Sequence, residues 1–339
     1  MVELLRDLEP ALMREGFDAR EQITGPLVDS LYANDDVLTK RLEDGLSFEF
    51  LYRSKIAREI VMAPENSRDH VWEPQTTRLL KMLSCIDADA VVGGAYSGDQ
   101  AIFIAHQLSK SGKAWCHCFE PNADQRQMLQ RNVELNRLGN VRVQSLGLWN
   151  NDDDLLRLVG FDSFAHAEVW DSQDVPDSSA FQTTTLNTYA LSHGIGRLGL
   201  IMLDIEGAEY AALQGASDFL MQPYETAPNI VFEVHRDYVD WSDGLEKTEL
   251  VTYLQSYGYE IFAVRDFNSS VDMKGCPVEL IPVAEVFVEG PRHGFNMLAI
   301  KDRKWITGDD FREIKNVSPK LLWHRDPRLH LPVELHAEP

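Results

Sequence analysis

Basic residues are scarce in this sequence. Its 339 residues hold 32 Lys and Arg against 54 Asp and Glu, which gives a formal net charge of −22 at pH 7. No run of Lys or Arg interrupts this acidity, so phosphate backbones and anionic lipid surfaces would be repelled. Nucleic acids and membrane surfaces are therefore not expected as partners.

Long apolar runs are missing as well. No stretch is long enough to cross a bilayer, and the N-terminus MVELLRDLEPALMREGFDAR is acidic where a signal peptide has a basic start and an apolar segment. A cytoplasmic location is predicted. The four cysteines match no repeated metal-binding spacing, and Cys116 and Cys118 would share one face of a strand, as reduced core residues do.

The residues that are present suffice for a large core, because 44% of them are hydrophobic. Residues 1–70 are charged and helix-like and predict an N-terminal helical extension. From Asp87 onward apolar strand-like runs alternate with amphipathic segments, which indicates an α/β domain with a mainly parallel sheet over residues 71–302. Residues 303–339 show no usable periodicity and are treated as a C-terminal tail. No internal repeat is present.

The acidic, loop-rich region from residue 151 to 185 interrupts this alternation. It ends in FQTTTLNTYA, whose threonine-rich run predicts an extra strand or a lid. Since it lies between the third and fourth expected strands of the sheet, we expect it to close over a bound ligand.

A glycine loop follows the first expected strand, in the stretch VVGGAYSGDQA. Gly94 and Gly98 allow the backbone to turn sharply and approach a ligand, and the amides at the start of the next helix favour a negative group. The spacing is not the G-x-G-x-x-G of dinucleotide-binding proteins. This loop indicates a nucleotide-type site.

An acidic residue, Glu120, ends the second expected strand and precedes Pro121 and Asn122. A carboxylate in that position can accept both hydroxyls of a ribose, while Asn122 is a natural helix cap. The alternative is that Glu120 only helps to cap the helix. Such a pair of features suits either NAD or S-adenosylmethionine.

Carboxylates also follow two later strands. In IMLDIEGAEYAALQGA, Asp204 and Glu206 are two residues apart and are expected on one side at the carboxyl end of the sheet, where ligands of open α/β sheets bind. Glu209, and as an alternative role Glu206, fits a favourable charge at the start of the next helix. In FEVHRD, Glu233 and His235 alternate onto one face in the same way, and the alternative for His235 is a half-exposed residue at the strand end that bonds a neighbouring loop.

The stretches FEPN, RNVELNRLGNV and LDIEGAEYAALQGA resemble the FkbM family of S-adenosylmethionine-dependent methyltransferases from about Trp72 to Asp302. The resemblance implies a class I, Rossmann-like methyltransferase fold: a seven-stranded, mostly parallel sheet with helices on both faces. It also implies transfer of a methyl group to a hydroxyl of a sugar, glycan or secondary metabolite. Val92 stands where the family has an acidic residue, so Asp99 or Glu73 is expected to substitute in holding the amino group of the cofactor.

The predicted site joins these features. The expected catalytic residues are His235 as general base with Asp204, Glu206 and Glu233 around the acceptor, and Glu233 could instead orient His235 or join Asp204 in holding a divalent metal. The expected cofactor-binding residues are Gly93, Gly94, Ala95, Gly98, Asp99, Glu120, Asn122, Glu73 and Asp204. A catalytically silent S-adenosylmethionine-binding module and an NAD-dependent oxidoreductase are the alternatives. The sequence leaves open a metal requirement, the acceptor and whether the chain forms a homo-oligomer.

Overall fold

The structure is a computed structural model that describes residues 1–12, 17–42, 45–53, 55–63, 72–84, 87–110, 112–160, 165–170, 179–267, 273, 275–289 and 294–321. The chain divides into two compact units. The first comprises Met1–Arg78, Ala263–Phe295 and Asp309–Pro339, and the second comprises Leu79–Phe262 and Asn296–Gly308. The predicted division at residues 70 and 302 places the boundaries elsewhere.

Five parallel strands form the centre of the second unit. They are β3 (Asp89–Gly93), β4 (Cys116–Phe119), β5 (Val141–Gln144), β10 (Leu198–Leu203) and β11 (Asn229–Val234). Their spatial order is β5-β4-β3-β10-β11. The order therefore runs outward in opposite directions from β3 and β10. In open α/β sheets this reversal marks the place where ligands bind, beyond the carboxyl ends of the strands.

The complete hydrogen-bonded sheet is larger than predicted. Beyond β11 come β14 (Phe295–Ile300) and β12 (Glu260–Phe267), which complete the expected seven strands. Strand β12 continues into the first unit, where β13 (Val278–Pro282), β15 (Phe311–Glu313) and β16 (Lys320–Leu321) bring the sheet to ten strands. The sheet therefore has ten strands and not the predicted seven, because residues 278–282, for which the sequence predicts no strand, and two segments of the predicted tail also pair as strands.

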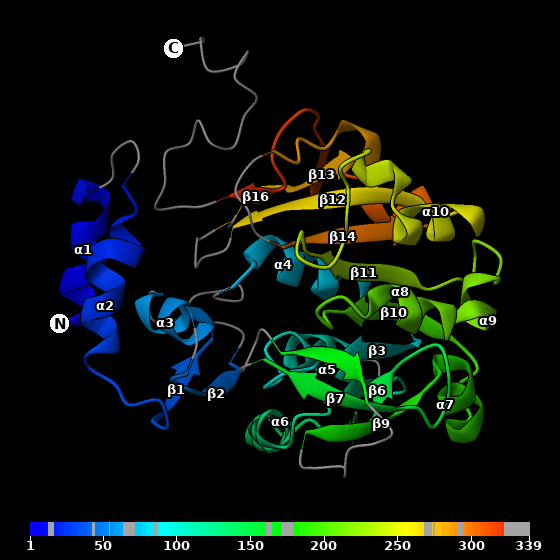
Figure 1. Ribbon diagram of the computed structural model, residues 1–339, viewed down its shortest axis with the longest axis horizontal. Helices are drawn as coiled ribbons and strands as arrows, with labels where there is room; N and C mark the ends of the chain where they lie inside the picture. The colour runs from blue at the N-terminus through cyan, green and yellow to red at the C-terminus, as the bar shows by residue number, and fades with distance from the viewer. Residues whose placement is uncertain are drawn as a thin grey trace. The chain divides into compact units, whose positions relative to one another are not determined.

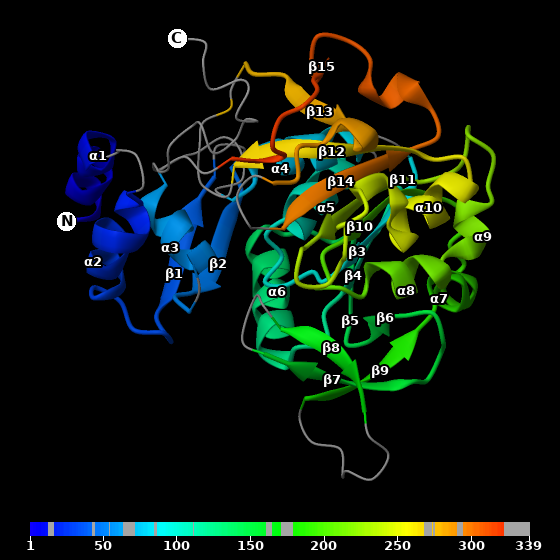
Figure 2. The same ribbon diagram turned by 45° about the horizontal axis from the view of Figure 1, so that its top comes forward.

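Helices cover both faces of the central strands. Figure 2 shows α5 (Ala101–Ser109) on one face and α8 (Glu209–Gln214) and α10 (Glu249–Ser256) on the other. Ala101, Ala105 and Leu108 of α5 are buried, as their spacing predicts. The described residues of this unit also form α6 (Ala123–Leu135), α7 (Leu186–His193), α9 (Ser217–Leu220), the second half of α4 (Pro74–Leu83) and the short 3-10 turns η3 (Leu245–Lys247) and η5 (Arg303–Ile306).

The region from 151 to 185 contributes three strands. These are β7 (Leu155–Val159), β8 (His166–Val169) and β9 (Ala180–Thr184), which join β6 (Gly147–Leu148) in a separate sheet of order β6-β9-β7-β8. The extra strand predicted for the threonine-rich run is confirmed as β9. Residues 161–164 and 171–178 of this region lie outside the described residues. Figure 2 shows the three strands together at the lower side of the view.

The N-terminal segment is helical with one exception. It contains α1 (Val2–Leu12), η1 (Arg20–Thr24), α2 (Gly25–Asp29) and α3 (Lys55–Met62), which Figure 1 shows in blue. Between them β1 (Val37–Arg41) and β2 (Ser47–Leu51) pair as an antiparallel hairpin that was not predicted. The predicted helical extension is thus corrected to a mixed one.

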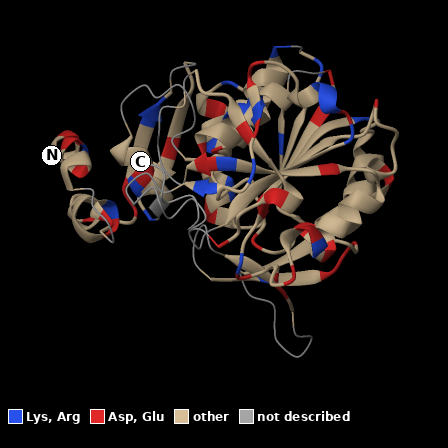
Figure 3. Ribbon diagram, turned by 90° about the horizontal axis from the view of Figure 1, so that it is seen from above, with Lys and Arg blue, Asp and Glu red and all other residues tan. Residues whose placement is uncertain are grey.

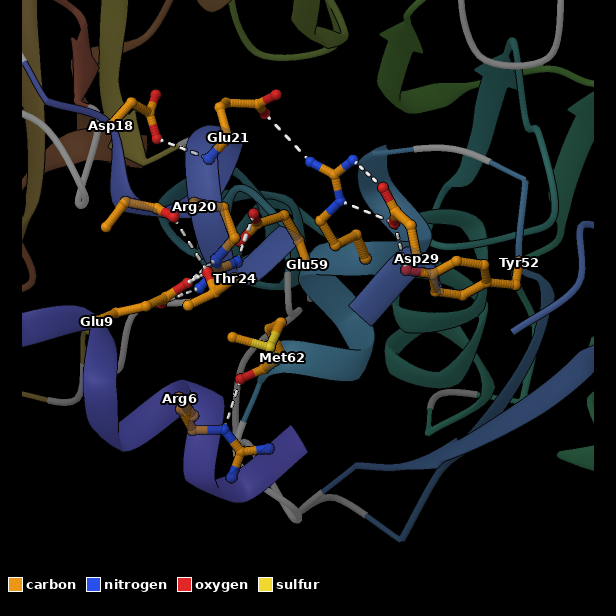
Figure 4. Close-up of polar contacts among 12 residues, drawn as sticks. Arg6, Glu9, Asp18, Arg20, Glu21, Thr24, Asp29, Tyr52, Glu59 and Met62 are labelled. Carbon is orange, nitrogen blue, oxygen red and sulfur yellow. Dashed lines mark hydrogen bonds and ion pairs between the residues drawn. The ribbon is translucent and has the colours of Figure 1, made fainter. Parts of the chain in front are cut away.

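A buried charge cluster joins the helices of this segment. Arg20 forms ion pairs with Glu9 of α1 and, at 2.5 Å, with Glu59 of α3 (Figure 4). All three side chains are buried, and the Thr24 hydroxyl also donates to Glu9. Removing one partner from such a cluster would leave an uncompensated buried charge, so the cluster fixes how the three helices pack.

No described helix is long and apolar enough to pass through a membrane. Figure 3 shows Lys and Arg scattered over different elements and interleaved with Asp and Glu. Cys116 and Cys118 are free and buried with their sulfurs 3.7 Å apart, as predicted, whereas Cys276 is exposed and Cys85 lies outside the described residues.

Candidate functional site

The glycine loop after β3 packs directly on the chain that follows β10. Gly94 has a φ of +72°, and a Cβ atom built on it would lie 1.8 Å from the backbone oxygen of Asp204. The amide of Asp204 donates to the carbonyl of Gly93 at 3.0 Å. Only glycine fits at position 94, for reasons of both backbone conformation and space. The glycine loop therefore lies next to the segment that carries Asp204 and Glu206.

The amides of this loop are used inside the protein. Gly94 and Ala95 both donate to the carbonyl of Phe119 at 3.0 Å, Gly98 donates to Ala95, and Tyr96 donates to the Glu120 carboxylate at 2.8 Å. The amides expected to favour a negative group are those at the start of α5, so that expectation stays a prediction. A loop whose amides are engaged offers little to a pyrophosphate, and this observation disfavours a dinucleotide.

Glu120 lies where β4 ends, buried beneath the glycine loop. One carboxylate oxygen accepts from Tyr96 and the other from the amide of Asn122, each at 2.8 Å. A carboxylate has about four lone-pair positions, so about two remain for further donors. Burial raises the pKa of Glu120 to about 7, against the lowering effect of these two hydrogen bonds.

Asn122 caps helix α6 as predicted. Its side-chain oxygen accepts from the amides of Asp124 at 3.0 Å and Gln125 at 3.2 Å. The cap occupies that oxygen, so the predicted cofactor contact of Asn122 would have to come from its amide nitrogen. Asp99 is half-buried and raises the pKa of Glu120 through its charge, which indicates that the two carboxylates are near each other.

The residues present fit S-adenosylmethionine. Glu120 offers acceptors to a ligand with two neighbouring hydroxyls, and the loop carries no free backbone donors at positions 94, 95, 96 and 98 to attract an anion. S-adenosylmethionine carries ribose hydroxyls, which can donate to the Glu120 carboxylate, and a sulfonium cation, which suits an acidic site. Gly98, at φ +93°, leaves no room for a Cβ because Leu129 lies 2.7 Å from that position. The predicted contacts of Gly93, Ala95, Asp99 and Asn122 to the cofactor stay predictions.

Three carboxylates meet at the carboxyl ends of β10 and β11. Oxygen atoms of Asp204, Glu206 and Glu233 all lie within 4.8 Å of one another, and the three residues are half-buried. Asp204 and Glu206 were expected to alternate on an extended strand, but β10 ends at Leu203 and Glu206 has a φ of +51°. A turn, and not a strand, brings the two side chains together. Three like charges so close repel each other unless a cation or hydrogen-bond donors approach them.

Glu209 holds this turn in place. Its carboxylate accepts from the amides of Ile205 at 2.9 Å and Gly207 at 3.0 Å. The side chain is buried at the start of α8, and burial raises its pKa to about 7. The interpretation of Glu209 as a residue of the helix start is supported, with the added role of fixing the acidic turn.

His235 follows β11 and lies beside the turn that ends at Tyr238. Its Nδ1 accepts from the amide of Asp237 at 3.1 Å and is 3.6 Å from the Asp237 carboxylate. When Nδ1 accepts a hydrogen bond, the neutral ring carries its proton on Nε2. His235 can therefore take a proton from an acceptor only if the ring gives up this hydrogen bond. Its role as general base stays a prediction.

Glu73 belongs to the first unit, at the start of α4 (Pro74–Leu83). It forms a buried ion pair of 2.7 Å with Lys320. The neighbouring Asp266 accepts from the amides of Gln75 and Thr76, and burial raises the pKa of Asp266 to about 7, with the Glu73 charge as the next cause. Glu73 thus has a structural partner, and its role toward the cofactor stays a prediction.

Two residues at the acidic turn were missed from the sequence. The Tyr238 ring packs on Gly207, and the ring of His166 on β8 lies 5.7 Å from that of Tyr238. Charges of Glu206, Asp237, Glu233 and Glu209 add to burial in raising the pKa of Tyr238 to about 12. The signal in the sequence was the proximity of Tyr238 to His235. Nothing in the sequence pointed to His166.

Residues 93–261 match the Methyltransferase FkbM domain. A search of curated proteins found no match. Among solved structures, a methyltransferase FkbM from Methylobacillus flagellatus KT shares 17% identity at a TM-score of 0.36, covering 63% of this chain and 44% of that protein. The chain thus spans less than half the length of that relative.

Two further solved structures are similar at comparable levels. A precorrin-6y C5,15-methyltransferase from Geobacter metallireducens GS-15 shares 10% identity at a TM-score of 0.37, covering 68% of this chain and 88% of that one. TYW2 from M. jannaschii, solved with AdoMet, shares 13% identity at a TM-score of 0.35, covering 79% and 86%. The match of residues 93–261 includes the glycine loop, Glu120 and the three clustered carboxylates, so this part of the chain is an FkbM methyltransferase domain.

Proposed function

We propose that this protein is an S-adenosylmethionine-dependent O-methyltransferase acting on a hydroxyl of a sugar, glycan or secondary metabolite. The observation that carries the proposal is the convergence of Asp204, Glu206 and Glu233 beside the glycine loop, at the point where the strand order reverses. A cofactor with a sulfonium cation and an acceptor with hydroxyl donors both suit an acidic wall.

The residues divide the work between cofactor and acceptor. Glu120 accepts the ribose hydroxyls, and the backbone at Gly94 and Gly98 allows close approach. When bound, S-adenosylmethionine supplies a methyl group on a sulfonium cation that transfers directly to the acceptor oxygen. The three clustered carboxylates orient the acceptor hydroxyl and stabilise positive charge, while alignment of the two partners supplies much of the rate.

A group near the acceptor must also take its proton, since an alkyl hydroxyl is a poor nucleophile until the proton is being removed. His235 is our first candidate because its ordinary pKa lies near neutral pH. One of the three carboxylates is the second candidate, favoured by the hydrogen bond that occupies Nδ1 of His235. Comparing single substitutions at His235 and at each carboxylate separates the two.

The same three carboxylates could instead bind a divalent cation. Three oxygen ligands within 4.8 Å suit a hard cation such as Mg²⁺. If a cation is needed, chelation with EDTA should abolish turnover and added Mg²⁺ should restore it. Turnover that is indifferent to both reagents would leave the carboxylates to the acceptor and the sulfonium.

The test of the proposal has two parts. Calorimetry should show binding of S-adenosylhomocysteine by the full chain, and incubation with S-adenosylmethionine and a panel of hydroxylated sugars and metabolites should yield a methylated product by mass spectrometry. Binding without transfer to any acceptor would favour the silent module. Quenching or enhancement of NADH fluorescence on titration, with no binding of S-adenosylhomocysteine, would favour the oxidoreductase.

A further inference from the structure

The base of the Tyr238 side chain packs against Gly207, in the turn formed by residues 204–207 (the acidic turn). A Cβ atom built on Gly207 would be 2.8 Å from both Cβ and Cγ of Tyr238, so the absence of a side chain at position 207 makes room for the ring. The amide of Tyr238 donates to the carbonyl of His235 at 3.0 Å, which fixes the short turn after β11. Tyr238 is thereby placed beside the loop that carries Glu206.

Two imidazole rings lie near the ring of this tyrosine. The ring centroids of His166 and Tyr238 are 5.7 Å apart at 42°, and those of His235 and Tyr238 are 5.7 Å apart at 48°. These separations are within the range of ordinary aromatic pairs. Because His166 belongs to β8, the sheet formed by the 151–185 region reaches the same surface as the acidic turn.

Part of the Tyr238 side chain and its hydroxyl group are available to a ligand. Its residue surface is 37% exposed, and among the described residues no hydrogen-bond partner is found for its hydroxyl. A part-exposed aromatic face can stack on the C–H face of a sugar ring, and the phenol can donate to a ring hydroxyl. Carboxylates at positions 206 and 233 beside it accept hydroxyl hydrogens and repel negative groups.

We propose that Tyr238, with His166 beside it, is the positioning surface for the acceptor, and that this acceptor is a neutral or amino-bearing polyhydroxylated ring and not an anionic one. The inference rests on the proposed methyltransferase function and narrows its substrate class. Tyr238 acts as a positioning residue, since it holds the acceptor ring so that one hydroxyl of the acceptor faces the three carboxylates.

The test uses the full chain saturated with S-adenosylhomocysteine and saturation-transfer NMR. The probes are a set of neutral hexopyranosides, the corresponding amino sugars, and glucuronic acid and glucose 6-phosphate as anionic members. We expect binding of neutral or amino members and none of the anionic ones. Tyr238→Ala should weaken the binding about three- to tenfold, and Tyr238→Phe should retain most of it because the stacking face remains.

His166→Ala should weaken the same probes by a smaller factor, and Tyr224→Ala, at an exposed tyrosine in the loop before β11, should change nothing. Calorimetry with S-adenosylhomocysteine on every variant shows whether the fold and the cofactor site persist. Anionic probes that bind as well as neutral ones, failure of all neutral and amino probes, or unchanged binding in Tyr238→Ala would overturn the inference. If S-adenosylhomocysteine itself does not bind the parent protein, the proposed function fails instead.

Discussion

Glu120 makes the cofactor site sensitive to pH at the scale of a single residue. Its pKa is about 7 in the unliganded protein because it is buried, and ribose hydroxyls bind best to the ionised carboxylate. Below pH 7 binding must first remove a proton, so affinity for S-adenosylhomocysteine should rise with pH by up to about tenfold per unit and level off above about pH 7. Calorimetry across this range measures the slope.

Substitutions of Glu120 separate its effect on the pH dependence of binding from the titration of other groups. Glu120→Gln should flatten the pH dependence, and Glu120→Ala should cost roughly 1.5–3 kcal/mol of binding free energy at pH 8 through lost charge-assisted bonds. Glu134→Ala, an exposed glutamate on α6, is the matched control. An affinity in folded Glu120→Ala equal to that of the parent would exclude Glu120 from the cofactor site.

Gly94 offers a test of the contact between the glycine loop and the acidic motif. Gly94→Ala would place a methyl group against the backbone of Asp204 in a left-handed conformation, so we expect a loss of at least about 2 kcal/mol in unfolding free energy. Gly139→Ala has open space and an ordinary φ and should be nearly neutral. Urea unfolding compares the two, and equal stabilities would contradict the packing described.

The role of His235 as the general base has the least support from the geometry of the site. If it is the base, His235→Ala should lower turnover by about 10²–10⁴ with cofactor affinity nearly intact. If the substitution leaves turnover near that of the parent, a carboxylate of the acidic turn takes the proton. Steady-state kinetics with the identified acceptor, alongside Asp204→Asn, Glu206→Gln and Glu233→Gln, assigns the role.

At the scale of elements, the strands β7, β8 and β9 are expected to respond to the acceptor. His166 on β8 contacts Tyr238 at the acidic turn, and closure over an acceptor would exclude competing water. Hydrogen exchange in these strands should slow when cofactor and acceptor are both present. Exchange that is already slow in the free protein, and is unchanged by either ligand, would rule out a lid.

The sequence predicted the central elements well and the site only in part. Strands β3, β4, β10 and β11 were foreseen because buried parallel strands are continuous apolar runs bounded by glycine or acidic residues. The meeting of Asp204 with Glu206 was foreseen for the wrong reason, since it depends on the positive φ of Glu206. Contacts such as Tyr238 with Gly207 and His166 join distant segments, and no local pattern encodes them.

At the scale of the whole molecule, three buried carboxyls make stability depend on pH. The pKa values of Glu120, Glu209 and Asp266 are each about 7 when folded, against ordinary values of 4.5 for Glu and 3.8 for Asp. The folded state therefore binds protons more tightly. Stabilisation from these groups is complete below about pH 4 and is lost as pH rises through about 7, by at most about 3 to 4 kcal/mol for each group.

Urea unfolding at about pH 5 and about pH 8 measures this change. Glu209→Gln should reduce the difference in unfolding free energy between the two conditions, because it removes one of the three titrating groups. Glu134→Gln removes an exposed carboxylate and leaves the difference unchanged. Greater stability at the higher pH would contradict the assignment of raised pKa values.

The most direct test of the account is a crystal structure of the full chain with S-adenosylhomocysteine. We predict that the ribose hydroxyls bind the Glu120 carboxylate and that the sulfur faces Asp204, Glu206 and Glu233, with Tyr238 on the open side. A nucleoside bound away from Glu120, or a sulfur turned away from all three carboxylates, would contradict the proposed methyl-transfer site.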